Sequence, residues 1–251
     1  MLSVSGLTKA YGGRTLFSDV SFRLLNGRRI ALVGGNGVGK TTILETIVGV
    51  READAGEVSR QKGVRVGYLP QELLDAWSGT VLEEVMRGAA HVLEIEAELR
   101  ELEPELASGD ADVMERYGEL QSQFEQLGGY QLEPEARRIL GGLGFTAPDM
   151  DRQLAEMSGG WQMRAALARL LLQKPDVLVL DEPTNHLDVD SVLWLEQQLS
   201  AFPGAILFVS HDRDFIDAVA ERVIEIARQS ATEYVGGFAE FVVLRLSLIH
   251  I

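Results

Sequence analysis

The stretch GGNGVGKT (residues 34–41) decides the fold. It fits the pattern G-x-x-x-x-G-K-[ST] and stands between RIALV, which predicts a strand, and KTTILETIVG, which opens a helix. Glycines let backbone N–H groups wrap around phosphate oxygens, and the amino terminus of the following helix adds positive potential. An ordinary glycine-rich turn is the alternative, but it accounts for neither flank. The stretch therefore predicts a phosphate-binding loop in which Lys40 reaches the β- and γ-phosphates and the Thr41 hydroxyl ligates Mg²⁺.

A second stretch, VLVLDEPTNHLD (Val177–Asp188), places two acids at the end of an apolar run. A carboxylate at the end of such a strand is the usual second half of a phosphate-loop site, so we expect Asp181 to hold Mg²⁺ directly or through water. Glu182 follows by one residue, where it can polarise an attacking water. Judged on adjacency alone, the alternative for Glu182 is a solvated loop acid.

Composition bounds the class of protein. The chain has 251 residues, of which 46% are hydrophobic, so it can bury the core of one large domain with an inserted subdomain. Its 38 acidic and 23 basic residues give a net charge of −15, which argues against broad binding of nucleic acids. Without cysteine it has no disulfide framework and no thiolate metal site. The sequence lacks a signal-peptide pattern and any run long enough to span a membrane, so we expect a soluble, cytoplasmic protein.

Short runs of strand type alternate with helical ones along the chain. LSVSGLT, VSFRL, RIALVG and RVGYLP predict strands, and DVLVLD and AILFVS are apolar in the manner of buried parallel strands. RVIEIA and TEYVGG predict edge strands. We therefore expect an α/β core with an antiparallel, β-rich amino-terminal portion.

Further motifs occur in the order found in ATP-binding-cassette (ABC) domains. SGGWQ (Ser158–Gln162) resembles the family's signature motif, Gln71 in YLPQE its glutamine loop, Asp188 its aspartate loop and His211 in FVSHD its switch histidine. Tyr11 in KAYGG stands where the family stacks an aromatic ring on adenine. Together with the phosphate loop and the acid pair, these motifs cover almost the whole chain. The resemblance implies the P-loop NTPase fold of an ABC domain, with ATP and Mg²⁺ as cofactors.

The same resemblance implies a role for each matching residue. Thr41, Gln71 and Asp181 would surround Mg²⁺, Glu182 would be the catalytic base, and His211 would contact the γ-phosphate. Taken singly, a tyrosine, glutamine or histidine is more often a packing, surface or structural residue. The residues implied to bind ATP are Tyr11, Gly34, Gly35, Asn36, Gly37, Val38, Gly39, Lys40, Thr41, Thr42 and Gln71. The residues implied to act in trans, on ATP bound to a second ABC domain, are Ser158, Gly159, Gly160 and Asp188.

The sequence DEPTNHLD followed by SHDRDF resembles the ABC-F family, whose members are soluble, carry two cassettes in one chain and have no membrane domain. Transporter cassettes more often have a Ser-Ala or similar pair where Asn185 and His186 stand. The signature region is also ABC-F-like, with Met157 in place of the usual leucine.

The segment between Gln71 and Ser158 is long for the helical subdomain of a transporter cassette, which we place at about residues 75–170. Apolar residues recur at spacings of four and three on both sides of the polar stretch PELASGDAD, and this pattern predicts an antiparallel helical hairpin, the arm, at about residues 93–127. The recurring residues are Ile95, Leu99, Leu102 and Leu106, then Val113, Tyr117, Leu120, Phe124 and Leu127. A longer helical subdomain without an arm is the alternative.

By resemblance, ABC-F proteins carry such an arm in the first cassette, where it reaches ribosomal elements. Residues 93–127 contain eleven acidic and two basic side chains, so this arm is poorly suited to bind rRNA phosphates. We expect it to touch ribosomal protein, or to make contact through its tip alone.

The last six residues, LSLIHI (residues 246–251), are what CTG TCT CTT ATA CAC ATC encodes, the transposon-end adapter used in DNA library preparation. Before them, VGGFAEFVVLR resembles the family's exit from the first cassette, where a charged linker should begin. We therefore expect residues 1–245 to be the cassette, residues 246–251 to be an untrimmed adapter, and the natural reading frame to continue. A genuine short apolar tail is the alternative.

Two classes of function remain open. The favoured one is the ATPase cassette of an ABC-F protein that binds the ribosome and modulates translation, with antibiotic protection as one variant. The alternative is the ATPase subunit of an ABC transporter, working as a homodimer against membrane partners. A DNA-repair or chromosome cassette is disfavoured, because those proteins separate their two halves by far longer coiled coils.

Overall fold

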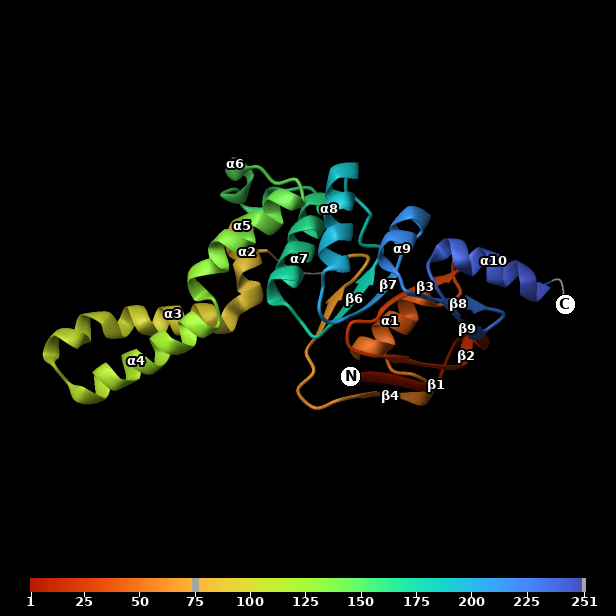
Figure 1. The fold of residues 1–251 in the computed structure, drawn as a ribbon, viewed down its shortest axis with the longest axis horizontal. Coiled ribbons are helices and arrows are strands. Elements are labelled where there is room, and N and C mark those ends of the chain that lie inside the picture. The colour runs from red at the N-terminus through yellow and green to blue at the C-terminus, as the bar shows by residue number, and fades with distance from the viewer. Residues whose placement is uncertain (74–76, 250–251) are drawn as a thin grey trace. The chain divides into compact units, whose positions relative to one another are not determined.

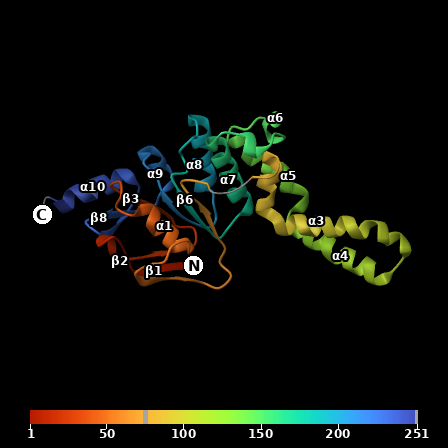
Figure 2. The ribbon, with the colours of Figure 1, turned by 180° about the vertical axis from the view of Figure 1, so that it is seen from behind.

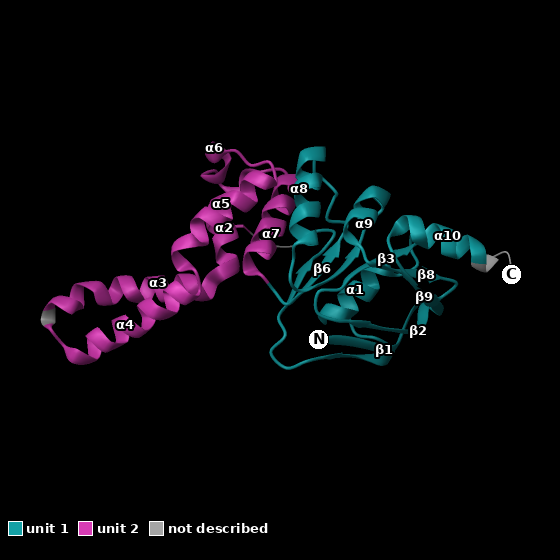
Figure 3. Cartoon of the chain, in the orientation of Figure 1, with its two compact units in different colours: residues 1–74, 175–251 teal, residues 75–174 magenta. Residues whose placement is uncertain are grey.

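In the computed structural model, which describes residues 1–73 and 77–249, the chain divides into two units. One unit comprises residues 1–74 with 175–251, and the other is the continuous segment 75–174 (Figure 3). The start of the helical subdomain predicted near residue 75 lies outside the described residues. None of the helices in the described ranges is both long enough and apolar enough to cross a bilayer.

A six-stranded sheet forms the centre of the first unit (Figure 1). Its strands, in spatial order, are β5 (Val66–Leu69), β6 (Val177–Asp181), β7 (Ala205–Val209), β3 (Arg29–Gly34), β8 (Arg222–Ala227) and β9 (Ser230–Val235). All neighbours are parallel except β8 and β9. Every residue of β6 and β7 is buried, as expected for apolar runs covered on both faces. Because the strands are parallel, the loops that follow β3, β6 and β7 emerge at the same edge of the sheet.

Strand β8 corrects one expectation, because RVIEIA is an interior strand, and of the two runs predicted to be edge strands only the one in β9 lies at an edge of the sheet. The single acid in this run, Glu225, gave the pattern of a half-exposed strand, yet its side chain is buried. Arg245 Nε lies 2.9 Å from one carboxylate oxygen of Glu225, and the Tyr234 hydroxyl donates to the other at 3.3 Å. A buried charge with both partners in place is compatible with an interior strand.

A smaller antiparallel sheet has the order β2-β1-β4, with β1 at Leu2–Tyr11, β2 at Arg14–Leu24 and β4 at Ala55–Arg60. The sequence AGEVSR of β4 was not predicted to be a strand. Five of its six residues are exposed, and the sequence lacks the alternation of apolar and polar residues that is typical of a half-buried strand. The strand is therefore held in place by its pairing with β1.

Helix α1 (Lys40–Val48) lies between the two sheets (Figures 1 and 2). Ile43 and Leu44 of this helix belong to the same hydrophobic cluster as Leu7 and Phe17 of the smaller sheet and Leu207 of the larger one. The beginning of α1 is thereby held rigidly at the end of β3. The remaining helices of this unit are α8 (Val189–Ser200), α9 (Arg213–Val219) and α10 (Phe238–Ile249).

Residues 246–249, the first part of the predicted adapter, continue helix α10, whereas His250 and Ile251 lie outside the described residues. The origin of this tail stays a prediction.

The second unit is helical. Its α-helices are α2 (Val81–Met86), α3 (Ala90–Leu102), α4 (Ala111–Gln126), α5 (Leu132–Gly142), α6 (Ala147–Met150) and α7 (Gly159–Gln173). Its 3₁₀ turns are η1 (Arg87–Ala89), η2 (Glu103–Ser108), η3 (Gly129–Gln131) and η4 (Leu154–Glu156). Capping is explicit at α2, where the Thr80 hydroxyl accepts from the Glu83 N–H and the Glu83 carboxylate accepts from the Thr80 N–H.

Helices α3 and α4 run side by side as a hairpin (Figures 1 and 2). Apolar contacts at its base join Val92 and Phe124, and Arg116 of α4 pairs with Glu98 of α3 at 2.7 Å. Part of the polar stretch predicted as a turn is the 3₁₀ turn η2, and Asp110 caps α4. Leu127 does not continue the apolar seam, because α4 ends at Gln126 and the Leu127 side chain is 48% exposed.

Candidate nucleotide-binding site

A cavity of about 500 Å³ opens at the carboxyl ends of β3, β6 and β7. Its wall includes most of the residues that the sequence predicted: Asn36, Gly37, Gly39, Lys40, Thr41, Thr42, Gln71, Asp181, Glu182 and His211. All of them belong to the first unit. Segments separated by more than a hundred residues of sequence thus contribute to one site, because the parallel sheet brings their strand ends together.

The glycine loop requires glycine for two separate physical reasons. Gly39 has a φ of 102°, a left-handed conformation that side chains disfavour, and an added Cβ would lie 2.9 Å from the Phe17 ring. At Gly34 an added Cβ would lie 2.6 Å from the backbone oxygen of Ile226. The loop can therefore pass close to neighbouring strands and still direct its N–H groups toward the cavity.

Lys40 is the first residue of α1 and is almost fully buried. Its ammonium donates to the backbone oxygens of Gly34 at 3.0 Å and Gly35 at 3.2 Å, so the loop wraps around the side chain. Burial lowers the pKa of Lys40, and the nearby carboxylates of Glu182 and Asp181 oppose that fall. The result is a cation held at the floor of the cavity beside two acids.

Asp181 ends β6 and has 2% of its surface exposed. Neither carboxylate oxygen has a hydrogen-bond partner among the residues that the structure describes. Burial raises the pKa of Asp181, and the neighbouring Thr41 hydroxyl and Lys40 ammonium only partly offset this rise. A buried, unpartnered carboxylate next to a hydroxyl is the kind of oxygen set that Mg²⁺ accepts.

If Mg²⁺ binds here, the residues that would hold it are Asp181, Thr41 and Gln71, which line the same cavity. Within residues 1–73 and 77–249 there is no group of three or more carboxylate, imidazole or thiol side chains that could hold a metal alone.

Glu182 and His211 form a pair across the ends of β6 and β7. The His211 backbone N–H donates to Glu182 Oε2 at 3.1 Å, and His211 Nε2 lies 3.3 Å from Oε1. Burial raises the pKa of Glu182, the histidine opposes this, and the adjacent Asp181 carboxylate adds to the rise. A carboxylate whose pKa is raised toward neutrality is better suited to accept a proton from water than a free surface acid.

The backbone of Glu182 is held in an unusual conformation. Its φ is 52°, in the left-handed region that residues with side chains rarely adopt, and its N–H donates to the Val209 oxygen at 2.9 Å. The turn closes when the Asn185 N–H donates to the Glu182 oxygen at 3.1 Å. This geometry directs the Glu182 side chain toward His211 instead of along the strand.

Asn185, Leu16 and Val209 also line the cavity, although the sequence did not predict them as site residues. Asn185 was considered only as part of a family pattern. Its position two residues after the DEP turn, in the loop that follows β6, was a signal that could have placed it at the site. Leu16 and Val209 are apolar and carry no such signal.

Tyr11 is not among the residues that line the cavity. It ends β1, its side chain is 43% exposed, and its hydroxyl accepts a hydrogen bond from Arg51 Nη1 at 2.9 Å. Lys9 Nζ lies 5.5 Å from the centre of its ring. The role of Tyr11 in stacking on adenine stays a prediction.

The residues implied to act in trans lie at two helix starts. Asp188 caps α8, where its carboxylate accepts from the Ser191 N–H at 2.9 Å. Ser158, in the second unit, is the exposed N-cap of α7, and its hydroxyl makes no capping hydrogen bond. Gly159 and Gly160 follow as the first residues of this fifteen-residue helix. The N–H groups at such a helix start are available to an anion.

Comparison with known proteins gives a family. The sequence profile of the family described as ABC transporter matches residues 17–185. The Bacillus subtilis (strain 168) protein YdiF is 40% identical over 246 residues, which are 96% of this chain and 38% of that protein. The ABC transporter F family member 5 of Arabidopsis thaliana is 34% identical, covering 99% of this chain and 37% of that protein. The energy-dependent translational throttle protein EttA of Mycobacterium tuberculosis (strain ATCC 25618 / H37Rv) is 37% identical, covering 93% and 42%. The chain thus spans less than half the length of each of these relatives.

Among solved structures, the ATP-binding subunit of an ABC transporter is similar with a TM-score of 0.71 at 18% identity, covering 94% of this chain and 90% of that one. At this identity the likeness concerns the fold alone. It confirms the fold class predicted from the motifs, a mixed α/β cassette.

Proposed function

Because this chain belongs to the ABC transporter family, whose ATP-binding domains are ATPases, we propose that it is the ATP-hydrolysing cassette of an ABC-F protein that binds the ribosome and modulates translation. The observation that carries this proposal is the 34% identity with an F family member over 99% of the chain. Because the match covers 99% of the chain, it includes the α3–α4 hairpin. A relative named as a translational throttle supports the same direction.

The chemistry follows from the contacts in the cavity. A water molecule beside Glu182 would attack the γ-phosphorus of ATP, its proton would pass to the Glu182 carboxylate, and the bond to the ADP oxygen would break. Lys40, at the floor, would hold the β- and γ-phosphates. His211 would both orient Glu182 and contact the transferred phosphoryl group. Mg²⁺, when bound, supplies positive charge to the phosphate oxygens.

One cassette would leave this site incomplete. The α7 start, with Ser158 and two glycines, offers N–H groups that would cap the γ-phosphate held by a second ABC domain. We infer that this second domain lies on the same full-length chain. The proposal includes a cytoplasmic location and, as a family variant, protection against antibiotics that bind the ribosome.

The test uses the full-length protein with Glu182→Gln. This change keeps the size of the side chain but removes the base, so ATP should bind and persist. We expect the variant to cosediment with ribosomes in MgATP and not in MgADP. A Lys40→Ala version of the same protein is the matched control, because it should lose ATP and therefore lose ATP-dependent cosedimentation.

Two outcomes would contradict the proposal. The first is intact ATP binding by the Glu182→Gln protein without ATP-dependent association with ribosomes. The second is copurification with a membrane permease, which would identify the chain as the ATPase subunit of a transporter.

A further inference from the structure

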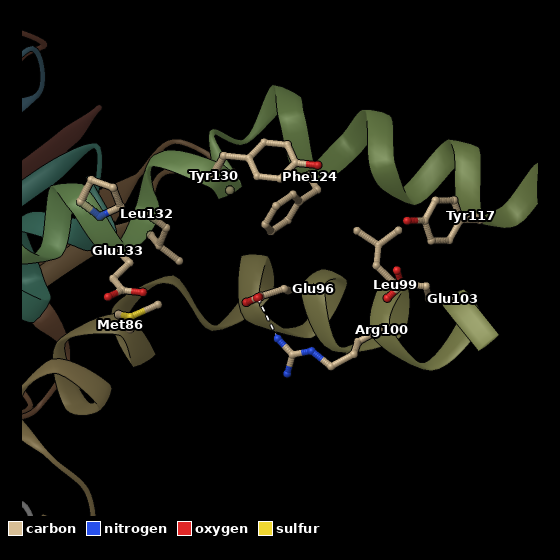
Figure 4. A pocket seen from close by; sticks show the side chains of 12 residues that line it. Met86, Glu96, Leu99, Arg100, Glu103, Tyr117, Phe124, Tyr130, Leu132 and Glu133 are labelled. Atoms are coloured by element: carbon tan, nitrogen blue, oxygen red, sulfur yellow. Dashed lines mark hydrogen bonds and ion pairs between the residues drawn. The ribbon is translucent and has the colours of Figure 1, made fainter.

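A second cavity, of about 380 Å³, lies within the helical unit between α3, α4, η3 and the start of α5 (Figure 4). The proposed ATPase chemistry does not use it. All of its lining residues come from residues 86–134, so its shape is set by this unit alone.

Apolar and aromatic side chains form much of the wall. Leu99 of α3 faces Tyr117 of α4, and the Phe124 ring points from α4 toward α3 (Figure 4). Tyr130 packs on Phe124 in an edge-to-face arrangement with ring centres 5.0 Å apart, yet it remains 63% exposed. Gly129 makes this possible, because an added Cβ would lie 2.2 Å from the Phe124 ring. An exposed aromatic ring is therefore held at the cavity by a close backbone approach.

The charged side chains in the wall are mostly acidic. The wall contains three acidic side chains and one basic side chain, which are Glu96, Glu103, Glu133 and Arg100. Glu96 pairs with Arg100 at 2.9 Å, and Glu133 pairs with Arg137 at 2.8 Å. The backbone N–H of Glu103 donates to the Leu99 oxygen, whereas its carboxylate has no hydrogen-bond or ion-pair partner within residues 1–73 and 77–249. Its exposed side chain lies beside Leu99 and Tyr117, so an unpaired carboxylate stands next to an apolar and an aromatic side chain of the cavity wall (Figure 4).

We propose that this cavity receives the side chain of an arginine or lysine from a basic protein segment. The aliphatic stem of such a side chain would pack on Leu99 and Phe124, and its cationic head would meet the Glu103 carboxylate. The exposed ring of Tyr130 at the rim adds a cation–π attraction for the same side chain. The surplus of nine acidic side chains over residues 93–127 supplies a field that draws further basic residues of the same segment and repels phosphate-bearing polymers and anionic lipids.

This inference does not depend on the proposed function, because it concerns a cavity of the helical unit and a ligand chemistry that neither ATP nor the ribosome defines. Binding of a basic peptide can be measured without nucleotide, so its failure leaves the ATPase and ribosome experiments untouched.

The experiment measures fluorescence anisotropy of a labelled peptide of alternating arginine and glycine against the 251-residue chain. The matched peptide has citrulline, the neutral isostere, in place of arginine. At an ionic strength of about 0.15 M, where the screening length is about 8 Å, long-range attraction is reduced and contacts dominate. We expect the arginine peptide to bind at least roughly tenfold more tightly than the citrulline peptide, because charge-assisted contacts are lost.

Two variants locate the binding. Each of the variants Glu103→Gln and Tyr130→Ala should lower the affinity for the arginine peptide by roughly 2–5-fold, which is the range expected for the loss of an exposed ion pair or a cation–π contact. Glu101→Gln and Met114→Ala are the matched controls, since both residues are exposed, they lie on helices α3 and α4 of the same hairpin, and neither lines the cavity. Circular dichroism and unchanged MgATP binding verify that every variant is folded.

Three results would overturn the proposal. An equal loss for Glu101→Gln and Glu103→Gln would assign the binding to the general acidity of the arm. Equal competition by free arginine at the same concentration would mean a small-molecule site. A dimer in sedimentation that Glu103→Gln dissociates would mean that a second copy of this chain is the occupant.

Discussion

Replacement of Asp181 by asparagine should stabilise the nucleotide-free chain while it removes most of the stabilisation by MgATP. Asp181 is 2% exposed, and neither carboxylate oxygen has a hydrogen-bond partner within the part of the chain that the structure describes, so its charge is only partly compensated when no Mg²⁺ is present. An unsatisfied buried polar group costs about 1–3 kcal/mol. Attraction to the Lys40 ammonium returns part of that cost, and the asparagine amide is itself left without a partner. The net gain in the free energy of unfolding should therefore be about 1 kcal/mol.

For a chain of this length, about 1 kcal/mol corresponds to a rise in Tm of about 2–4 °C. The assay is thermal unfolding followed by dye fluorescence, with EDTA in one series and MgATP in the other. At an ATP concentration about a hundred times Kd, binding should stabilise the native chain by about 2.7 kcal/mol. Asp181→Asn should lose most of this stabilisation, so the order of the two Tm values should reverse between EDTA and MgATP.

The same comparison has a defined dependence on pH. Because burial raises the pKa of Asp181 in the folded chain, the folded state binds the proton more tightly than the unfolded state, and stability falls as pH rises through this window. The advantage of Asp181→Asn in EDTA should therefore be full above the raised pKa and shrink as pH falls toward about 3.9, the pKa of a free aspartate.

Asp151→Asn is the control, because Asp151 is exposed and loses the same charge. Its Tm should equal that of the parent in both series. A lower Tm for Asp181→Asn than for the parent in EDTA would refute the reasoning, since the carboxylate would then be stabilising without a cation.

Three more outcomes follow from the site. Glu182→Gln should retain ATP binding and lower steady-state turnover of the full-length protein by roughly 10²–10⁴-fold, and unchanged phosphate release would show that another group activates the water. Gly39→Ala should lower Tm more than Gly37→Ala does. Both have positive φ, but only the added Cβ at Gly39 meets the Phe17 ring, so equal losses in thermal unfolding would remove that contact from the explanation. Phosphate release by the 251-residue chain alone should rise more than linearly with its concentration, and further with moderate salt, because two acidic copies must associate to complete a site; strict proportionality at low concentration would contradict this.

The elements around the phosphate loop could be predicted because their sequences are constrained locally. Interior strands such as β6 and β7 are apolar throughout, since both faces are covered, and a glycine loop of this kind fits few other conformations. The order of the strands in the sheet, in contrast, could not be predicted from the sequence. Pairing of β3 with β7 and β8 joins distant segments, and no local pattern in any one of them records its neighbour.

What the sequence missed was decided by contacts distant along the chain. The polar strand β4 is held by pairing with β1, and the charge of Glu225 is accommodated in β8 by Arg245 and Tyr234. Likewise, the orientation of the Tyr11 ring follows from a hydrogen bond with Arg51, forty residues away, which no spacing rule anticipates.

The place of β3 in the sheet has a consequence for how the chain is made. Its two neighbours, β7 and β8, begin at Ala205 and Arg222, roughly 170 residues or more after β3 ends at Gly34. At synthesis rates of about 5–20 residues per second, β3 waits on the order of ten seconds or more with both edges unpaired. The continuous segment 75–174 has no such delay and can fold while it emerges. The nascent chain therefore exposes an apolar strand, flanked by its phosphate loop, until β7 and β8 have been made, and chaperones can bind there during that time.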